Sequence, residues 1–222
     1  MLLAVDGLCF GYGGPPVIDG VSLELEQGHV LGIVGANGSG KSTLLKLIAG
    51  VLYPDSGAVK VGGRPVRTPA SRGMVGLVPE RAPVDERLRL SEYLRLWGLI
   101  QGMGRADAAA AAERAAARLG LSGMMNAPVG SLSRGRQRLA CLARSLVHGP
   151  WLLCLDEPTD GLDRDSSRLV EKVIDEQRKT GSVIMASHRP ELVAKSCDRV
   201  VLLGGGRLSA SLRFDSSLCP EE

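Results

Sequence analysis

A glycine-rich stretch early in the chain has the residue types and spacing to bind phosphate groups. It fits the pattern G-x-x-x-x-G-K-[ST], and its residues are Gly35, Ala36, Asn37, Gly38, Ser39, Gly40, Lys41, Ser42 and Thr43. The glycines let the backbone curl so that successive N–H groups point at one anion, and a following helix adds its positive end. Lys41 would contact the terminal phosphates and Ser42 would offer its hydroxyl to Mg²⁺. An ordinary glycine turn is the competing interpretation, but the apolar strand before the stretch and the helical segment after it favour a nucleotide-binding loop.

Two neighbouring carboxylates would complete the chemistry of a nucleotide site. Asp156 and Glu157 directly follow the apolar run Trp151–Leu155. A strand that ends in this way places both acids at the carboxyl edge of a parallel sheet, where such sheets bind ligands. Asp156 would orient Mg²⁺ through its water shell, and Glu157 could polarise a water for in-line attack on a γ-phosphate. Solvated acids at a strand end are common, but beside a phosphate-binding loop the pair favours hydrolysis over binding alone.

Short apolar runs and helical segments indicate the elements that must position these groups. Alternation of apolar and polar residues predicts half-buried antiparallel strands at Leu2–Val5 and Val21–Leu25. Further strands are expected at Val30–Val34, Gly57–Val61, Met74–Val78, Trp151–Leu155, Ser182–Ala186 and Arg199–Leu203, and helices at Thr43–Ala49, Ala106–Leu119, Gln137–Val147 and Ser166–Lys179. The polar tail Ser211–Glu222 is expected to fray.

The order of these elements predicts an α/β fold. Strands that alternate with helices form a parallel sheet with crossover helices. Strand formers thin out between residues 87 and 147, where an alanine-rich segment is the strongest helix signal of the chain. We therefore expect one domain over residues 1–222, with a parallel core sheet, an N-terminal antiparallel β-subdomain and an α-helical insert at about 87–147.

Composition and charge narrow the class of protein. The 222 residues carry a net charge of +3 and only 3% aromatic residues, so we expect no nucleic-acid partner. The apolar runs fall short of the roughly 18 residues of a membrane-spanning helix, and residues 1–6 do not resemble a secretory signal. The five cysteines form neither a C-x-x-C pair nor a zinc spacing, which is typical of a reducing compartment. These patterns predict a cytoplasmic protein.

Three further motifs make the chain similar to the ATP-binding subunits of ABC transporters. They are Leu-Ser-Arg-Gly at residues 132–135, Gly-Leu-Asp at 161–163 and His188 after a predicted strand, and they occur in the family's order with the phosphate loop and the acid pair. The resemblance extends from Tyr12 to His188. It implies a P-loop NTPase that hydrolyses ATP with Mg²⁺. His29 and His148 match no family position and are expected to be surface or packing residues.

The resemblance also implies roles for single residues. Tyr12 would stack on adenine. His188 would contact the γ-phosphate beside the catalytic Glu157 and sense its loss. Asp163 would belong to the nucleotide-binding residues.

A dimer and a membrane partner follow from the same resemblance. Ser133 and Gly135 lie at the start of a predicted helix and would form a second phosphate-binding surface. Two such subunits, identical or different, would pair head-to-tail, so that each ATP lies between Lys41 of one and Ser133 of the other. The pair would drive an integral membrane permease from the cytoplasmic face of the cell membrane.

Some positions depart from the usual family pattern. Glu80 stands where glutamine is usual, and it would contact Mg²⁺ or the attacking water. The run around it resembles subunits that serve ABC-2-type exporters, which suggests export. Arg134 and Arg136 replace the common glycine and glutamine, and a guanidinium there could strengthen phosphate binding or crowd it. Together with Arg138, these arginines could equally form a solvated basic face.

The permease contact is expected between the sheet and the helical insert, around Glu80–Trp97. Its apolar surface would come from Leu88, Leu90, Tyr93 and Trp97, although helical periodicity would also place such residues in a core.

Other functions for a phosphate-binding loop are disfavoured to different degrees. An ABC-type ATPase that acts on DNA or ribosomes stays an alternative, although the chain has none of the long coiled coil, zinc hook or second ATPase domain that we would expect there. A GTPase should carry N-K-x-D, but Gly and Ala follow the only asparagines, Asn37 and Asn126. A regulatory subunit that binds ATP without hydrolysis is disfavoured because Lys41, Asp156, Glu157 and His188 are all intact.

Overall fold

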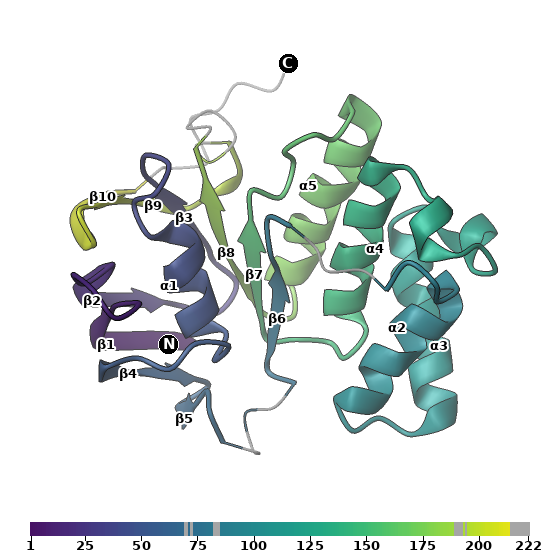
Figure 1. Cartoon of the computed structure of the whole chain (residues 1–222), viewed down its shortest axis with the longest axis horizontal. Helices are drawn as coiled ribbons and strands as arrows, with labels where there is room; N and C mark the ends of the chain where they lie inside the picture. The colour runs from purple at the N-terminus through teal and green to yellow at the C-terminus, as the bar shows by residue number, and fades with distance from the viewer. Residues whose placement is uncertain (69–70, 72, 82–84, 189–192, 194, 214–222) are drawn as a thin grey trace.

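Two β-sheets and a group of helices make up the part of the chain that the computed structural model describes, residues 1–68, 71, 73–81, 85–188, 193 and 195–213 (Figure 1). The smaller sheet is antiparallel and has the strand order β2-β1-β4-β5. Its strands are β1 (Leu3–Phe10), β2 (Ile18–Leu25), β4 (Ser56–Val61) and β5 (Arg64–Pro65). Buried and exposed residues alternate along the second half of β2, so one face of this sheet packs on the core.

The larger sheet carries the strands that lead into the predicted site. Its order is β10-β9-β3-β8-β7-β6. The strands are β3 (Val30–Val34), β6 (Val75–Val78), β7 (Leu152–Asp156), β8 (Ser182–Ser187), β9 (Arg199–Gly204) and β10 (Arg207–Arg213). All neighbours are parallel except β10 and β9. Every residue of β7 and β8 is buried, which explains why both segments are almost continuously apolar.

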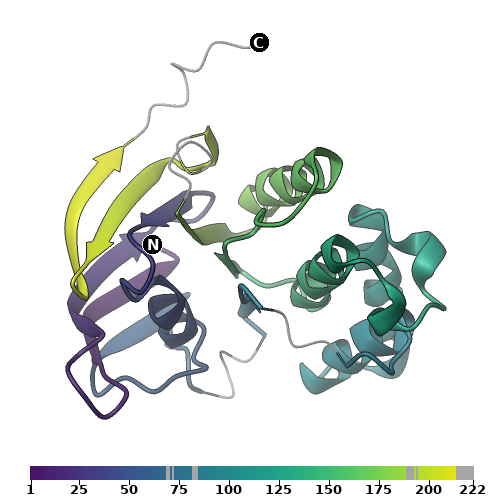
Figure 2. The same cartoon turned by 45° about the horizontal axis from the view of Figure 1, so that its top comes forward.

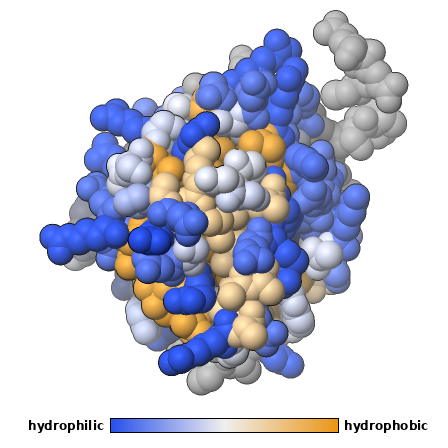
Figure 3. Space-filling view, turned by 90° about the vertical axis from the view of Figure 1, so that its right-hand side faces the viewer, coloured by the Kyte–Doolittle hydropathy of each residue, from blue (hydrophilic) through white to orange (hydrophobic). Residues whose placement is uncertain are grey.

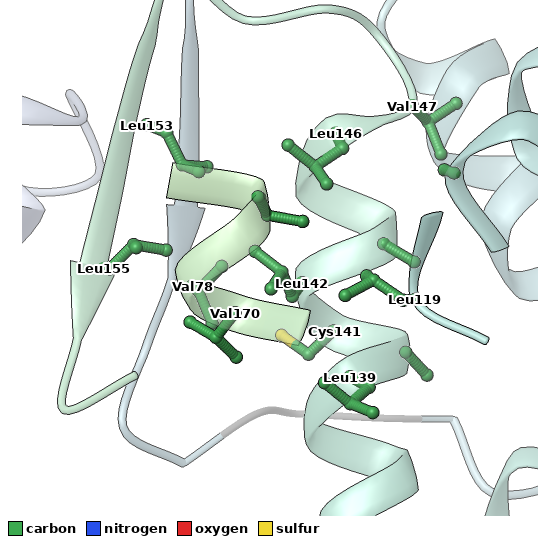
Figure 4. Packing of buried hydrophobic residues seen from close by; sticks show 14 of the residues in the cluster. Val78, Leu119, Leu139, Cys141, Leu142, Leu146, Val147, Leu153, Leu155 and Val170 are labelled. Atoms are coloured by element: carbon green, nitrogen blue, oxygen red, sulfur yellow. The ribbon is translucent and has the colours of Figure 1, made fainter. Parts of the chain in front are cut away.

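Helices cover both faces of the larger sheet. Helix α1 (Lys41–Ile48) lies between the two sheets (Figure 1), and its apolar side chains share a buried cluster with Leu152 and Cys154 of β7. The alternate residues of β7, Leu153 and Leu155, belong to a second cluster with α4 (Arg134–Leu146) and α5 (Arg164–Arg178). Figure 4 shows this second cluster, in which Leu139, Leu142 and Leu146 of α4 are labelled together with Val170 of α5. Alternation along β7 therefore places α1 and α4 on opposite faces of the sheet.

The helical insert consists of α2 (Leu90–Ile100), α3 (Arg105–Arg118) and α4, with short 3₁₀ turns at Ser122–Met124 and Val129–Ser131. The buried face of α3 is made of Ala108, Ala111, Ala112, Ala115 and Ala116. These small side chains let α2 approach closely, since a Cβ placed on Gly98 would lie 3.0 Å from the Cβ of Ala108. Figure 2 shows α2 and α3 on the side of α4 that faces away from the sheets. The expected α/β architecture, with its antiparallel β-subdomain and helical insert, is thus confirmed.

Several boundaries differ from the predictions, most clearly in β1, in α4 and in the polar tail. β1 continues to Phe10, well beyond Val5, because β2 and β4 pair with it on both sides. α4 begins at Arg134, three residues before Gln137, because Ser133 caps its start. The expectation that residues 211–213 fray is wrong, since they pair with β9 as part of β10; the rest of that tail, 214–222, lies outside the described residues.

The apolar surface of the insert also differs from the prediction. Leu90 and Tyr93 are only 0% and 6% exposed, so they belong to the core and cannot form a permease contact. Leu88 and Trp97 are half-buried. The exposed apolar residues of α2 are Leu96, Leu99 and Ile100. Figure 3 shows hydrophobic side chains gathered among hydrophilic ones on the side of the molecule where the insert lies. None of the described helices is long and apolar enough to cross a membrane.

Candidate functional site

The phosphate-binding loop connects β3 to α1 and has room for few side chains. Gly40 has a φ of 101° at the start of α1, and a Cβ there would lie 2.9 Å from the carbonyl oxygen of Val17. A Cβ on Gly35 would come within 2.3 Å of a backbone oxygen of β9. Both positions therefore require glycine. The Nζ of Lys41 donates hydrogen bonds to the carbonyl oxygens of Gly35 (2.7 Å) and Ala36 (3.0 Å), so the loop closes around the ammonium group.

The two acids lie where β7 ends. Asp156 is 3% exposed and Glu157 is 9% exposed, which is unusual for carboxylates. Glu157 has a φ of 48° and is the one non-glycine residue with a positive φ among those that the structure describes. A left-handed backbone at such a residue is held by its surroundings and is common at functional sites.

The carboxylate of Glu157 is held by the end of the neighbouring strand β8. Ser187 donates its hydroxyl to Oε2 over 3.0 Å, and the backbone N–H of His188 donates to Oε1 over 2.8 Å. The Nδ1 atom of His188 lies 2.9 Å from the same Oε1. The predicted catalytic residues are therefore in direct contact, although 31 positions separate them in the sequence.

The loop, the acids and the histidine line one pocket with a volume of about 520 Å³. Its lining comprises Tyr12, Val17, Asn37, Gly38, Gly40, Lys41, Ser42, Thr43, Glu80, Asp156, Glu157, Asp160 and His188. The remaining predicted loop residues, Gly35, Ala36 and Ser39, belong to the loop that forms its wall. Four of the lining side chains are carboxylates and one is a lysine, so a triphosphate in this pocket would need a cation to offset repulsion.

The donor atoms of the pocket fit Mg²⁺. The Oδ1 atom of Asp156 is buried and has no hydrogen-bond partner among the described atoms, and such an orphaned oxygen is costly unless a ligand meets it. Burial raises the pKa of Asp156; the Ser42 hydroxyl opposes this, whereas Glu80 and Glu157 add to it through charge repulsion. Oxygen ligands are those that Mg²⁺ prefers, usually with phosphate and water completing the shell. Ser42, Asp156 and Glu80 are thus the residues that would hold the ion.

Tyr12 stands at the edge of this pocket. Its ring packs edge-on against Phe10, with centroids 4.8 Å apart and an interplanar angle of 86°. Its hydroxyl lies 3.3 Å from Oγ1 of Thr43. The side chain remains 62% exposed, so an aromatic surface is available beside the phosphate loop.

The other predicted nucleotide contacts lie elsewhere. Ser133, Gly135 and Asp163 are not among the described residues that line the pocket. Ser133 caps α4 by accepting the N–H of Arg136, over 3.4 Å. Asp163 caps α5 by accepting the N–H of Ser166 over 2.7 Å, and this hydrogen bond lowers the pKa of Asp163. Within one chain the pocket therefore forms without the 132–135 motif.

Arg138 makes contacts near the site that the sequence did not indicate. Its guanidinium donates to backbone carbonyl oxygens of Glu80, Asp156, Glu157 and Pro158. The interpretation of Arg138 as part of a solvated face is therefore wrong, whereas Arg134 and Arg136 are exposed. The sequence pattern of a helix cannot distinguish an arginine that faces solvent from one that binds backbone carbonyl groups. The carbonyl groups that Arg138 binds come from segments distant in the sequence.

Known proteins with similar sequences are ATP-binding proteins of transport systems. The family model described as "ABC transporter" matches residues 18–160. The ABC transporter ATP-binding protein NatA of Bacillus subtilis (strain 168) is 35% identical over 85% of this chain and 78% of its own length. The Hemin import ATP-binding protein HmuV of Streptomyces coelicolor is 37% identical, over 95% and 77%. The Nod factor export ATP-binding protein I of Ralstonia nicotianae is 32% identical, over 93% and 65%.

Solved structures of such proteins share this fold. One described as "Structure of ATP binding subunit of ABC transporter" superposes with a TM-score of 0.88, at 26% identity, and the match covers 96% of this chain and 90% of the other. The similarity therefore includes both sheets and the helical insert.

Proposed function

The chain belongs to the ABC transporter family of ATP-binding proteins, and we propose that two ATPase subunits enclose Mg²⁺·ATP and drive a separate membrane permease. The observation that carries the proposal is the pocket in which Lys41, Asp156, Glu157 and His188 meet. A fold of this kind hosts many chemistries, so these four side chains, rather than the fold, support ATP hydrolysis.

Each group of the pocket has a part in hydrolysis that its chemistry suits. The loop N–H groups and the Lys41 ammonium bind the β- and γ-phosphates. Ser42, Asp156 and Glu80 would hold Mg²⁺, which would supply positive charge to the phosphates. Glu157 accepts a proton from the attacking water, and Ser187 and His188 hold its carboxylate where it lines the pocket. His188 stays beside Oε1 of Glu157, where it can contact the γ-phosphate.

A second subunit supplies the rest of the nucleotide site. Ser133 and Gly135 begin the 13-residue helix α4, whose first N–H groups favour an anion. They lie outside the pocket of their own chain, so the phosphate that they bind belongs to a partner subunit. The basic side chains of Arg134 and Arg136 beside them complement the four carboxylates of the partner's pocket.

The permease binds on the helical insert, at the cytoplasmic face of the membrane. Leu96, Leu99 and Ile100 expose apolar surface on α2, and the loop that carries Glu80 joins the same insert to the pocket. A docking segment of the permease would therefore contact both the insert and a Mg²⁺ ligand. Export is the direction that we propose, because the chain resembles ABC-2-type subunits around Glu80; one relative is named for Nod factor export and another for hemin import, so the proposal rests on the residues around Glu80.

Two measurements on the intact chain test this function. The Glu157→Gln variant with saturating Mg²⁺·ATP should elute as a dimer, whereas the same variant without nucleotide should elute as a monomer. Wild-type protein should co-purify with a multi-span membrane protein from detergent-solubilised membranes of its own organism, and reconstitution of the two should stimulate ATP hydrolysis. Efficient hydrolysis with no membrane partner, but with bound DNA or ribosomes, would instead favour the alternative class of ABC ATPase.

A further inference from the structure

A single arginine of α4 connects two loops of the nucleotide pocket. The Nη1 atom of Arg138 donates to the carbonyl oxygen of Glu80 over 2.9 Å. Nη2 donates to the carbonyl oxygens of Asp156, over 3.1 Å, and Glu157. Nε points to the carbonyl oxygen of Pro158 at 3.4 Å. The planar guanidinium thus spans the loop after β6 and the turn after β7, a geometry that a lysine ammonium cannot reproduce.

Two of these hydrogen bonds flank Glu157, which has the most strained backbone among the residues that the structure describes. Glu157 has the left-handed φ of 48°, which persists only where neighbouring groups hold it. Ser187 and His188 hold its carboxylate from the side of β8. Arg138 holds its backbone from the side of the helical insert, through the carbonyl groups before and after the Cα of Glu157. Side chain and backbone of Glu157 are therefore fixed by two different parts of the fold.

The position of Arg138 on α4 is itself rigid. The next residues of the helix, Leu139 to Leu146, are all buried, so α4 is anchored in the core on both the insert side and the sheet side. Movement of α4 would therefore be transmitted to the guanidinium rather than absorbed by the helix. Since the start of α4 also carries Ser133, the same helix joins the proposed partner-facing surface, the loop of Glu80 and the turn of Glu157.

We propose that Arg138 is a positioning residue for ATP hydrolysis, which orients Glu157 and couples its geometry to α4 and the loop of Glu80. The inference rests on the proposed ATPase function. It assigns Arg138 no contact with nucleotide or Mg²⁺, because the guanidinium donates to backbone carbonyl groups and does not line the pocket. Loss of Arg138 should therefore affect turnover and leave nucleotide affinity unchanged.

The test compares Arg138→Lys and Arg138→Gln with Arg114→Lys, a matched change on the exposed surface of α3. Steady-state hydrolysis at saturating Mg²⁺·ATP and equilibrium binding of Mg²⁺·ATP are measured for each. We expect kcat of both Arg138 variants to fall roughly tenfold to hundredfold, since a misplacement of about 1 Å at a reacting group costs about that much. Nucleotide affinity should stay within about twofold, and Arg114→Lys should match wild type. Retained affinity also shows that the variants are folded.

A double-mutant cycle separates positioning from a general loss of structure. If Arg138 acts through Glu157, Arg138→Lys should lower the residual turnover of Glu157→Gln by no more than about twofold, because the base that it orients is already gone. Wild-type kcat in Arg138→Lys, equal losses of kcat and affinity, or fully additive losses in the double variant would each overturn the inference. Absence of ATP hydrolysis in the wild-type chain, with or without its membrane partner, would instead contradict the proposed function itself.

Discussion

One carboxylate oxygen of Glu157 contacts His188 twice: Oε1 accepts the backbone N–H of His188 at 2.8 Å and lies 2.9 Å from Nδ1 of the same histidine. The arrangement joins the ends of the adjacent parallel strands β7 and β8. It orients the carboxylate and leaves the imidazole beside the pocket. Removal of either side chain should therefore disturb the other, and hydrolysis should respond more strongly than binding.

Glu157→Gln should bind Mg²⁺·ATP with nearly unchanged affinity and hydrolyse it roughly a hundredfold or more slowly, because an amide cannot accept a proton from water. Phosphate release and equilibrium nucleotide binding measure the two quantities. Glu113→Gln, on the exposed side of α3, is the matched control and should behave like wild type. Undiminished turnover in Glu157→Gln would remove the general base from the mechanism.

Lys41→Ala should lose roughly tenfold or more in affinity for ATP, since a hydrogen bond to a charged group contributes about 1.5–3 kcal/mol. The ammonium now satisfies the carbonyl groups of Gly35 and Ala36, so the loop itself should also become less ordered. Calorimetric titration with ATP measures the affinity. Lys46→Ala, in the last turn of α1, provides a lysine control on the same helix; equal affinity in Lys41→Ala and Lys46→Ala would contradict the assignment.

Asp156→Asn should raise the Mg²⁺ concentration needed for half-maximal hydrolysis. The amide keeps the shape of the buried side chain but removes the negative charge that attracts the ion. Affinity for ATP in the presence of EDTA should not fall, because Asp156 acts on nucleotide through the cation. A variant with wild-type Mg²⁺ dependence would show that Asp156 has a packing role only.

Thermal stability should depend on pH through His148, whose two ring nitrogens are buried. Burial lowers the pKa of His148 below the ordinary 6.5, and the Val75 backbone opposes this only in part. Below pH 6.5 the unfolded chain takes up a proton that the folded chain does not, so the free energy of unfolding should fall as the pH falls. Well above pH 6.5 both states are neutral and the contribution of His148 should be flat.

The variants His148→Gln and His29→Gln distinguish this residue from the rest of the chain. Melting temperatures between pH 5 and 8 should show a shallower decline on the acidic side for His148→Gln than for wild type. His29 is exposed, so His29→Gln should keep the wild-type slope. Parallel curves for all three proteins would mean that other groups cause the acid sensitivity.

Local patterns predicted most of the elements because their cause is local. Val30–Val34 is a buried strand as expected, and the loop after it needs glycine at positions that the pattern already contains. Prediction was weaker where the length of an element depends on neighbouring strands. β1 is longer than its alternation of apolar and polar residues indicates, because two strands pair with it. Leu90 and Tyr93 lie on a helix that is apolar on more than one side, so periodicity alone could not separate core from surface.

The candidate site likewise contains residues that the sequence predicted and one that only the structure revealed. The chemistry of Lys41, Asp156 and Glu157 could be predicted because each stands beside a strand end or loop with a characteristic neighbourhood in the sequence, whereas the role of His188 followed only from the resemblance to a known family. Arg138 could not be predicted, because the carbonyl groups that it binds are 58 residues away in one direction and up to 20 in the other.

The amino-acid sequence alone determined which groups can bind phosphate, hold Mg²⁺ and accept a proton, since these properties belong to residue types at short spacing. Only the tertiary structure decided that the backbone of Glu157 is left-handed, that His188 donates its backbone N–H to the carboxylate of Glu157 and that Arg138 binds the carbonyl oxygen of Glu157. Such contacts depend on which strands become neighbours in the sheet and on where α4 packs, and burial of apolar surface across the whole chain sets both.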